Sequence, residues 1–193
     1  SYGMEFLYQQ KLINQFYAIL AYTWVHSEFK DKSDVYVPTA WDSKHIVSLT
    51  GGKRFNKGWE IGFRWLFSGG SPYTPYDIPT STLQQNWDIN GLGILDYNLL
   101  NTKREANFHQ LNIRIDKKIY LDKFSMNFYL DIQNAYGSKT VLAPILLVET
   151  DVNGLPVVDP NDPSSYSAKL IENSSGIVQP TIGIVIEFKV NKR

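Results

Sequence analysis

Large apolar residues recur at every second position over several long stretches of the chain. In residues 59–67 every odd position holds a large apolar side chain, and the even positions include Glu60 and Arg64. Residues 111–116 and 126–132 alternate in the same way. Successive side chains of a β-strand point to opposite faces of a sheet, so this period of two predicts strands rather than helices.

Alternation of this kind predicts seven strands. They lie at about 3–12, 15–27, 44–55, 58–68, 109–120, 124–135 and 179–190. Each has roughly 10–13 residues, about twice the usual length of a strand in a globular protein. With a rise of about 3.3 Å per residue and a tilt near 45°, ten residues climb roughly 23 Å, which matches the apolar band of an outer-membrane barrel.

The connections between these strands are alternately short and long. Short polar turns stand at 13–14, 56–57 and 121–123, whereas loops rich in Gly, Pro, Ser, Asn and Asp cover 28–43, 69–108 and 136–178. Loops of about 40 residues without structure of their own are uncommon in compact soluble domains. Short turns on one side and long loops on the other are typical of a transmembrane β-barrel, whose long loops lie outside the cell.

The last of these loops is predicted to contain a hairpin of its own. Residues 141–150 and 166–171 flank Asn153-Gly154, a dipeptide that strongly favours a tight turn between strands. Residues 141–150 are also the only candidate for an eighth long strand. Pro144 makes them a poor one, because proline donates no hydrogen bond to a ladder.

The two faces of the predicted strands differ in polarity. The apolar face is expected to meet lipid, and its members are Trp59, Phe63, Trp65, Phe67, Phe128, Ile184, Ile186 and Phe188. The opposite face is expected to line a wet lumen, and its charged members are Glu60, Arg64, Arg114, Asp116 and Asp131. Cross-strand pairing of the two arginines with these carboxylates is the usual arrangement of wall charges. A soluble antiparallel sheet with one buried face gives the same alternation, so strand length and loop asymmetry decide for the membrane barrel.

Composition narrows the functional classes further. The chain has 193 residues, and its 19 Lys+Arg balance 19 Asp+Glu, so no overall charge attracts nucleic acid or an anionic surface. It contains no cysteine, which excludes disulfides, thiolate metal sites and a cysteine nucleophile. No run approaches the roughly 18 apolar residues that a membrane-spanning helix needs.

The sequence offers no pattern for catalysis, for a metal or for a cofactor. The three histidines, His26, His45 and His109, are far apart and lack metal-ligand spacing, and no G-x-S-x-G nucleophile motif occurs. The acidic residues of loop 136–178 lack the register of a calcium-binding loop and are interpreted as solvated. We therefore expect neither enzyme activity nor a cofactor.

Aromatic residues in the second long loop are candidates for ligand contact. The rings of Tyr73, Tyr76 and Trp87 bury much area at little entropic cost, which suits contact with a sugar, a siderophore or a peptide. The alternative is that they pack the loops against each other or form the outer aromatic girdle of the barrel.

An odd number of strands does not fit a complete bacterial barrel, because bacterial single-chain barrels have even strand numbers. The chain also starts directly with a strand, with neither a signal peptide nor a plug ahead of it. We therefore expect it to be part of a longer protein. Two alternatives stay open. One is a self-contained small outer-membrane barrel, such as an adhesin, an outer-membrane enzyme or a porin-like protein, and the other is a soluble all-β carbohydrate-binding module.

Several segments resemble one family of membrane proteins by their order and spacing. They are YVPTAWDSKH at 36–45, LTGG at 49–52, SGGSPYTPYD at 68–77, FHQLNIRIDKK at 108–118, LDIQN at 130–134 and PTIGIVIEF at 180–188. Together they are similar to the barrels of TonB-dependent receptors of Bacteroidetes-type bacteria, and the resemblance runs over residues 2–188. Residues 1–193 would correspond to the C-terminal portion of such a barrel.

This resemblance implies an outer-membrane receptor that takes up scarce nutrients. Such receptors have a 22-stranded barrel filled by an N-terminal plug, so seven up-and-down strands would be its C-terminal third. The implied partners are the plug and other strands of the receptor, the TonB–ExbB–ExbD complex acting through an N-terminal box, membrane lipid and, in the starch-utilisation type, a capping surface lipoprotein. The plug and the box are missing from this chain. Family members usually end at a terminal aromatic, whereas Phe188 is followed here by residues 189–193.

Overall fold

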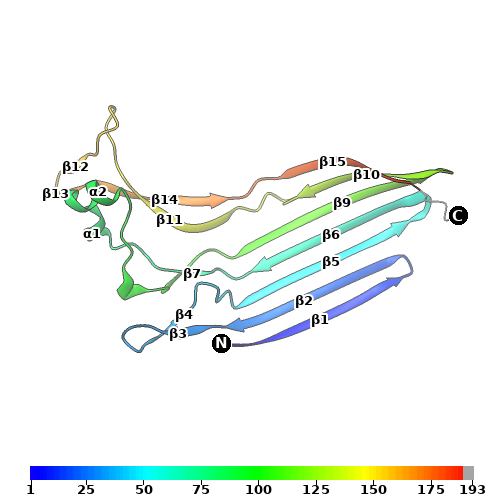
Figure 1. The fold of residues 1–193 in the computed structure, drawn as a ribbon, viewed down its shortest axis with the longest axis horizontal. Helices are drawn as coiled ribbons and strands as arrows, with labels where there is room; N and C mark the ends of the chain where they lie inside the picture. The colour runs from blue at the N-terminus through cyan, green and yellow to red at the C-terminus, as the bar shows by residue number, and fades with distance from the viewer. Residues whose placement is uncertain (189–193) are drawn as a thin grey trace.

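The computed structural model describes residues 1–188 and has an all-β architecture of antiparallel sheets, as the sequence predicts. Its main sheet has seven strands in the order β1-β2-β5-β6-β9-β10-β15 (Figure 1). They are β1 (Tyr2–Ile13), β2 (Phe16–His26), β5 (His45–Phe55), β6 (Trp59–Ser68), β9 (Phe108–Tyr120), β10 (Phe124–Gln133) and β15 (Gln179–Phe188). These bounds differ from the predicted ones by at most two residues. The end of the last predicted strand, at 189–190, and the tail after Phe188 lie outside the described residues.

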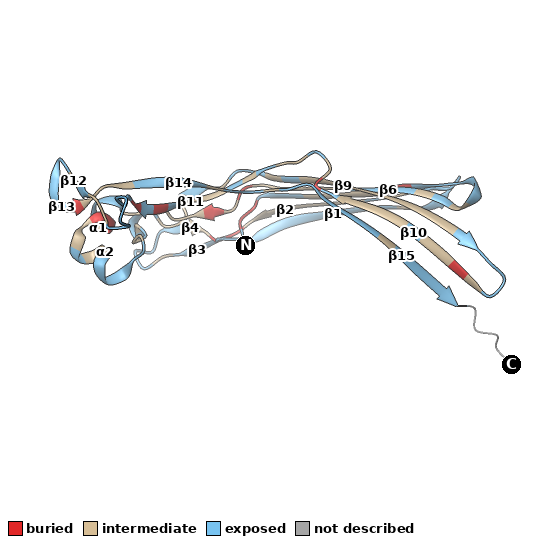
Figure 2. Ribbon diagram, turned by 90° about the horizontal axis from the view of Figure 1, so that it is seen from above, coloured by how far each residue is buried: buried red, intermediate tan, exposed pale blue. Residues whose placement is uncertain are grey.

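The main sheet is a single open layer. β1 and β15 each pair with one neighbour, so both outer edges are free within residues 1–188, and Figure 2 shows the strands curving as one layer. In the same part of the chain, the buried apolar side chains are those of Pro72, Leu146 and Val148, which all lie in the long loops, the last two on the loop strand β11 (Thr140–Val148). The main sheet therefore has no hydrophobic core on either face.

The register sorts the side chains of the main sheet onto one apolar and one polar face. Residues directly opposite each other in an antiparallel pair point to the same side. Phe63 faces Gly51 and Ile113 on its neighbouring strands, and the next residue, Arg64, faces Asn112. Followed across the sheet in this way, the eight positions predicted to meet lipid share one face, and the five predicted lumen residues share the other.

Short turns join the long strands at one end of the sheet. Between β1 and β2, Asn14 and Gln15 both have positive φ, 49° and 67°, which is the backbone of a type I′ hairpin turn. The turn between β5 and β6 is the 3₁₀ segment η1 (Asn56–Gly58), and residues 121–123 join β9 to β10. The three long loops leave the sheet at the opposite end (Figure 1).

The long loops are folded, and the second contains helices that the alternation did not predict. The loop elements are β3 (Glu28–Lys30), β4 (Tyr36–Pro38), β7 (Pro72–Tyr73), α1 (Ile78–Thr82), α2 (Gln84–Asn90), η2 (Tyr97–Leu99), β8 (Lys103–Arg104), β11, β12 (Val158–Asp159), β13 (Asp162–Tyr166) and β14 (Ala168–Ser175). α1 begins after Asp77, whose side chain accepts a hydrogen bond from the Thr80 N–H, and α2 ends at Gly91 with a φ of 61°. Both are ordinary helix-end signals, so the helices follow from local chemistry.

The third loop contains the predicted hairpin, with different strand bounds. β11 pairs with β14, but β12 and β13, which pair with each other, lie between them in the chain. The turn at Gly154 closes a separate short pair, Thr150 with Pro156, in which the Asp151 N–H bonds to the Leu155 carbonyl. Pro144 lies at a break in the register between residues 142 and 145, where its missing N–H removes no hydrogen bond from the ladder. Because β11 pairs with β14 outside the main sheet, it is not an eighth strand of that sheet.

Candidate functional site

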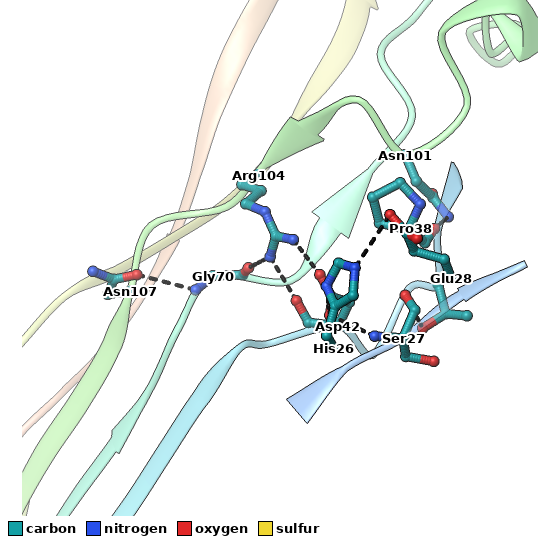
Figure 3. A network of polar contacts seen from close by, with 10 residues as sticks. His26, Ser27, Glu28, Pro38, Asp42, Gly70, Asn101, Arg104 and Asn107 are labelled. Carbon is teal, nitrogen blue, oxygen red and sulfur yellow. Dashed lines mark hydrogen bonds and ion pairs between the residues drawn. The ribbon is translucent and has the colours of Figure 1, made fainter. Parts of the chain in front are cut away.

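The first and second long loops are joined through the segment 101–106, as Figure 3 shows in close-up. Asn101 Nδ2 donates a hydrogen bond to the Pro38 carbonyl at 2.7 Å. Arg104 Nη1 donates to the carbonyl of Asp42 at 2.5 Å and to that of Gly70 at 2.9 Å. The guanidinium therefore sits between the two loops and holds them together.

Asp42 is the buried anchor of this contact. Its side chain has no exposed surface, its Oδ1 accepts from the Ser27 N–H at 2.9 Å, and its Oδ2 pairs with Arg104. Burial by itself would raise the pKa of Asp42, but the hydrogen bonds from Ser27 and Arg104 outweigh it and hold that pKa below its ordinary value. His26 lies 3.6 Å away on the other side and also reaches Glu28 at 3.3 Å. A buried charge is tolerated where such partners replace water.

The third loop is joined to the same segment. The Ala143 N–H donates to Glu105 Oε1 at 3.0 Å, and the Ala106 N–H donates to the Val141 carbonyl at 3.0 Å. Further out, Tyr166 donates to Asp88 at 3.0 Å, and this bond raises the pKa of the Tyr166 phenol. All three loops therefore form one connected assembly beyond one end of the sheet (Figure 1).

The assembly contains an open pocket of about 520 Å³, here called the loop pocket. It is lined by residues of all three loops: Ala40, Pro72, Tyr73, Thr74, Pro75, Tyr76, Ile78, Leu95, Asn101, Lys103, Ala143, Pro144 and Leu170. Two of the three aromatic residues predicted for ligand contact, Tyr73 and Tyr76, line the pocket. The third, Trp87, lies on α2 and is not among the lining residues.

The wall that carries Tyr76 is fixed by backbone pairing. Tyr76 bridges to Leu95, and the Asp96 N–H donates to the Pro75 carbonyl at 2.9 Å. The buried Ser81 hydroxyl joins α1 to this pair, because it donates to the Asp77 carbonyl at 2.6 Å and accepts from the Ile94 N–H at 2.8 Å. The pocket is thus preformed by the fold of the loop.

The lining is mostly apolar, and its polar groups divide into two kinds. Thr74 and Asn101 are hydrogen-bonded to each other. The Thr74 hydroxyl donates to Asn101 Oδ1 at 3.3 Å and accepts from the Asn101 backbone N–H at 3.0 Å. In contrast, the phenols of Tyr73 and Tyr76 and the ammonium of Lys103 make no hydrogen bond or ion pair with any residue of 1–188. Three polar groups are therefore available to a ligand. Lys103 was not predicted, because a single lysine in a loop carries no sequence signal.

On the polar face of the main sheet, the predicted lumen charges are paired in part. Glu60 accepts from Tyr17 at 3.1 Å and from Arg54 at 3.0 Å. Arg114 binds Asp116 of its own strand through two hydrogen bonds of 2.9 Å, rather than a carboxylate across the sheet. Arg64 and Asp131 make no side-chain hydrogen bond or ion pair with another residue in the part of the chain that the structure describes.

The histidines and the loop acids have local partners. His45 contacts Tyr22 at 2.9 Å, and His109 contacts Tyr136 at 2.8 Å. Asp151 accepts from the N–H groups of Leu155 and Asn153, which lowers the pKa of its carboxyl and closes its turn. Across residues 1–188, no group of three or more His, Asp or Glu side chains is placed to hold a metal ion.

No protein-family model matches the chain, and no curated protein shows significant similarity to it. Within residues 1–188, none of the helices combines the length and the apolar composition needed to cross a bilayer. The resemblance to TonB-dependent receptors stays a prediction from the sequence.

Proposed function

We propose that this chain forms part of the wall and three external loops of an outer-membrane receptor for TonB-dependent nutrient uptake. The observation that carries the proposal is the seven-stranded main sheet, whose apolar face is covered by no other element in residues 1–188. On that face, Ile184 is 56% exposed and Phe188 is 75% exposed. A soluble sheet buries such a face beneath a second layer, whereas lipid accepts it directly.

The polar face supports the same arrangement. It carries the Glu60–Arg54 and Arg114–Asp116 pairs, which suit a hydrated interior and are out of place against hydrocarbon. One face for lipid and one for water is the side-chain arrangement of a barrel wall.

In a membrane, the two free edges of the sheet would need further strands to pair with. β1 and β15 leave a row of backbone groups without partners in residues 1–188. Each unsatisfied group costs several kcal/mol in lipid, so spanning sheets are closed. In this proposal the remaining strands belong to the rest of the receptor, which also supplies a plug and the segment that engages TonB–ExbB–ExbD. A surface lipoprotein caps the barrel if the receptor is of the starch-utilisation type.

The two ends of the sheet fix its orientation in the proposal. The turns at Asn14, at η1 and at 121–123 are short and lie toward the periplasm, and the folded loops lie outside. Aromatic residues stand near both ends of the apolar face, with Trp59 beside the short turns and the Tyr2–Trp24 pair, 5.7 Å between ring centroids, beside the loops. Such positions suit the two interfaces of a bilayer. The chain itself carries out no bond chemistry in this account.

The test is the intact mass of the native protein in the outer-membrane fraction of the bacterium. A mass several times 22.1 kDa is expected, because the wall needs the rest of the receptor. A mass near that of the chain would favour the alternative, a self-contained small outer-membrane barrel such as an adhesin or a porin-like protein. Absence from the membrane fraction would overturn both.

A further inference from the structure

We infer that the loop pocket binds an amphiphilic small molecule, one with an apolar, ring-bearing body and an acid group. The pocket lies among the outer loops, so as a statement about the nutrient taken up, this inference rests on the proposed function. As a statement about binding, it rests on the lining residues alone.

The apolar body is indicated by the pocket's walls. Pro72, Pro75 and Pro144 present carbon surfaces without N–H donors, and Leu95 and Leu170 add aliphatic surface. The rings of Tyr73 and Tyr76 complete the lining and favour flat partners, since aromatic pairs stack in offset or edge-to-face arrangements.

A sugar fits this lining poorly. A polyhydroxylated ligand needs many hydrogen-bonding groups, because each hydroxyl buried without a partner costs free energy. The amide of Asn101 and the hydroxyl of Thr74 are already bonded to each other, and Asn101 also bonds to Pro38. The groups left over are the two phenols and one ammonium, which suffice for a single polar head.

The acid group is indicated by Lys103. This residue pairs with Tyr73 across the β7–β8 ladder, and both side chains line the pocket. Among the other loop lysines, Lys30 lies 2.7 Å from Asp34 and Lys169 lies 3.8 Å from Glu149. Within residues 1–188, Lys32 and Lys139 have no carboxylate partner, but they do not line the pocket. Lys103 has none within residues 1–188, and the charge of its neighbour Arg104 is already matched by Asp42. The pocket therefore carries one positive charge that a carboxylate, phosphate or sulfonate would neutralise.

The size and rigidity of the pocket suit a ligand of two or three fused rings. Sites for small organic ligands have volumes of about 300–1,000 Å³ and are usually preformed. The loop pocket, at about 520 Å³, lies within that range. Its walls are held by the contacts of segment 101–106, so little ordering accompanies binding.

The test measures binding of three bicyclic probes to the intact native protein in a zwitterionic detergent, by saturation-transfer NMR. The probes are 2-naphthoate, 2-naphthyl phosphate and the uncharged 2-naphthalenemethanol, and maltotriose serves as the polyol. We expect one or both acids to bind about tenfold more tightly than the alcohol, the usual worth of a charged hydrogen bond. The stronger of the two identifies the acid. Maltotriose should not compete.

Variants assign the effect to the pocket. Lys103→Met should abolish the preference for the acid, and Lys103→Arg should keep it. Lys32→Met is the matched control, because Lys32 is an exposed lysine of the outer loops that does not line the pocket. Tyr73→Leu should weaken the acids and the alcohol alike.

Three results would overturn the inference: equal affinity for acid and alcohol, displacement of 2-naphthoate by maltotriose, or a Lys103→Met protein that behaves like the Lys32→Met control. Cell fractionation separates this inference from the proposed function. Acid-selective binding by a protein absent from the outer membrane would overturn the proposed function alone, whereas an outer-membrane protein without acid selectivity would overturn this inference alone.

Discussion

Tyr129 lies flat against Gly183, the residue directly opposite on β15, so that a Cβ at position 183 would stand 2.4 Å from the tyrosine Cζ. Tyr17 has the same relation to Gly52, where a Cβ would stand 2.6 Å from the ring Cζ. Both tyrosines are on the polar face, and the Arg114 guanidinium stacks on the Tyr129 ring at 4.1 Å from its centroid. In the proposed barrel these rings lie along the inner side of the wall.

Replacing Gly183 should therefore disturb the sheet. In Gly183→Val the new side chain displaces Tyr129 and its stack with Arg114, and we expect a loss of about 1–3 kcal/mol in the free energy of unfolding. Urea titration of the intact protein in lipid vesicles, followed by tryptophan fluorescence, measures this loss. Gly62→Ala is the control, since a Cβ there would meet nothing closer than 3.4 Å. Equal stability of the two variants would contradict the packing described.

Removing Arg104 should loosen the first loop. Arg104→Leu leaves the Asp42 carboxylate buried without its cation, a change that costs about 3 kcal/mol where burial is maintained. We expect faster hydrogen exchange of the amides in 27–44, and partial recovery when Asp42→Asn is added. Lys30→Leu breaks the exposed pair with Asp34, which should matter little. Unchanged exchange in the Arg104 variant would show that this ion pair does not hold the loops together.

The same carboxylate makes the loop contact sensitive to acid. The pKa of Asp42 in the folded loops lies below its ordinary value of 3.8. Ionised Asp42 therefore contributes its full stabilisation above that value, and the contribution is lost as the pH falls through the lowered pKa. Protection of loop 27–44, corrected for intrinsic exchange, should be constant at neutral pH and decline below about pH 4. Asp42→Asn should remove this decline, and protection that grows on acidification would contradict the sign.

The two faces of β6 should respond differently to a charge. Phe63→Lys places an ammonium on the proposed lipid face near the middle of the strand, at a cost of about 2–4 kcal/mol. Leu66→Lys places it on the opposite, polar face, where water is available. The amount of each variant that reaches the outer membrane in folded form measures the difference. Similar amounts of both would contradict the assignment of faces.

The strands and their faces were predictable because they depend on a local and repeated signal. Each of the seven long strands has ten or more residues, and stretches such as 59–67, 111–116 and 126–132 alternate within them. Exceptions at single positions, such as Leu66 on the polar face, therefore do not hide the period of two. The turn chemistry at Asn14 and Gly154 is equally local. Because opposite residues of paired strands point to the same side, the alternation of each strand also sets the two faces of the whole sheet.

The loop assembly was less predictable because its contacts join distant residues. Asp42 and Arg104 are 62 positions apart, and nothing in the local sequence pairs them. Of the three aromatic residues proposed for ligand contact, Tyr73 and Tyr76 line the loop pocket and Trp87 does not, since the fold of 75–96 decides which ring turns inward. The signals for α1 and α2 were present in Asp77, Pro79 and Gly91, although alternation does not detect them.

Spin-label accessibility along β10 tests whether one face of the main sheet meets lipid and the other meets water. The sequence contains no cysteine, so single cysteines at positions 126–132 give unique labels within this chain. In the membrane-embedded protein, labels at 126, 128, 130 and 132 should be accessible to oxygen, and labels at 127, 129 and 131 to a water-soluble nickel chelate. Accessibility to the nickel chelate at all seven positions, or an alternation of the opposite phase, would contradict the account.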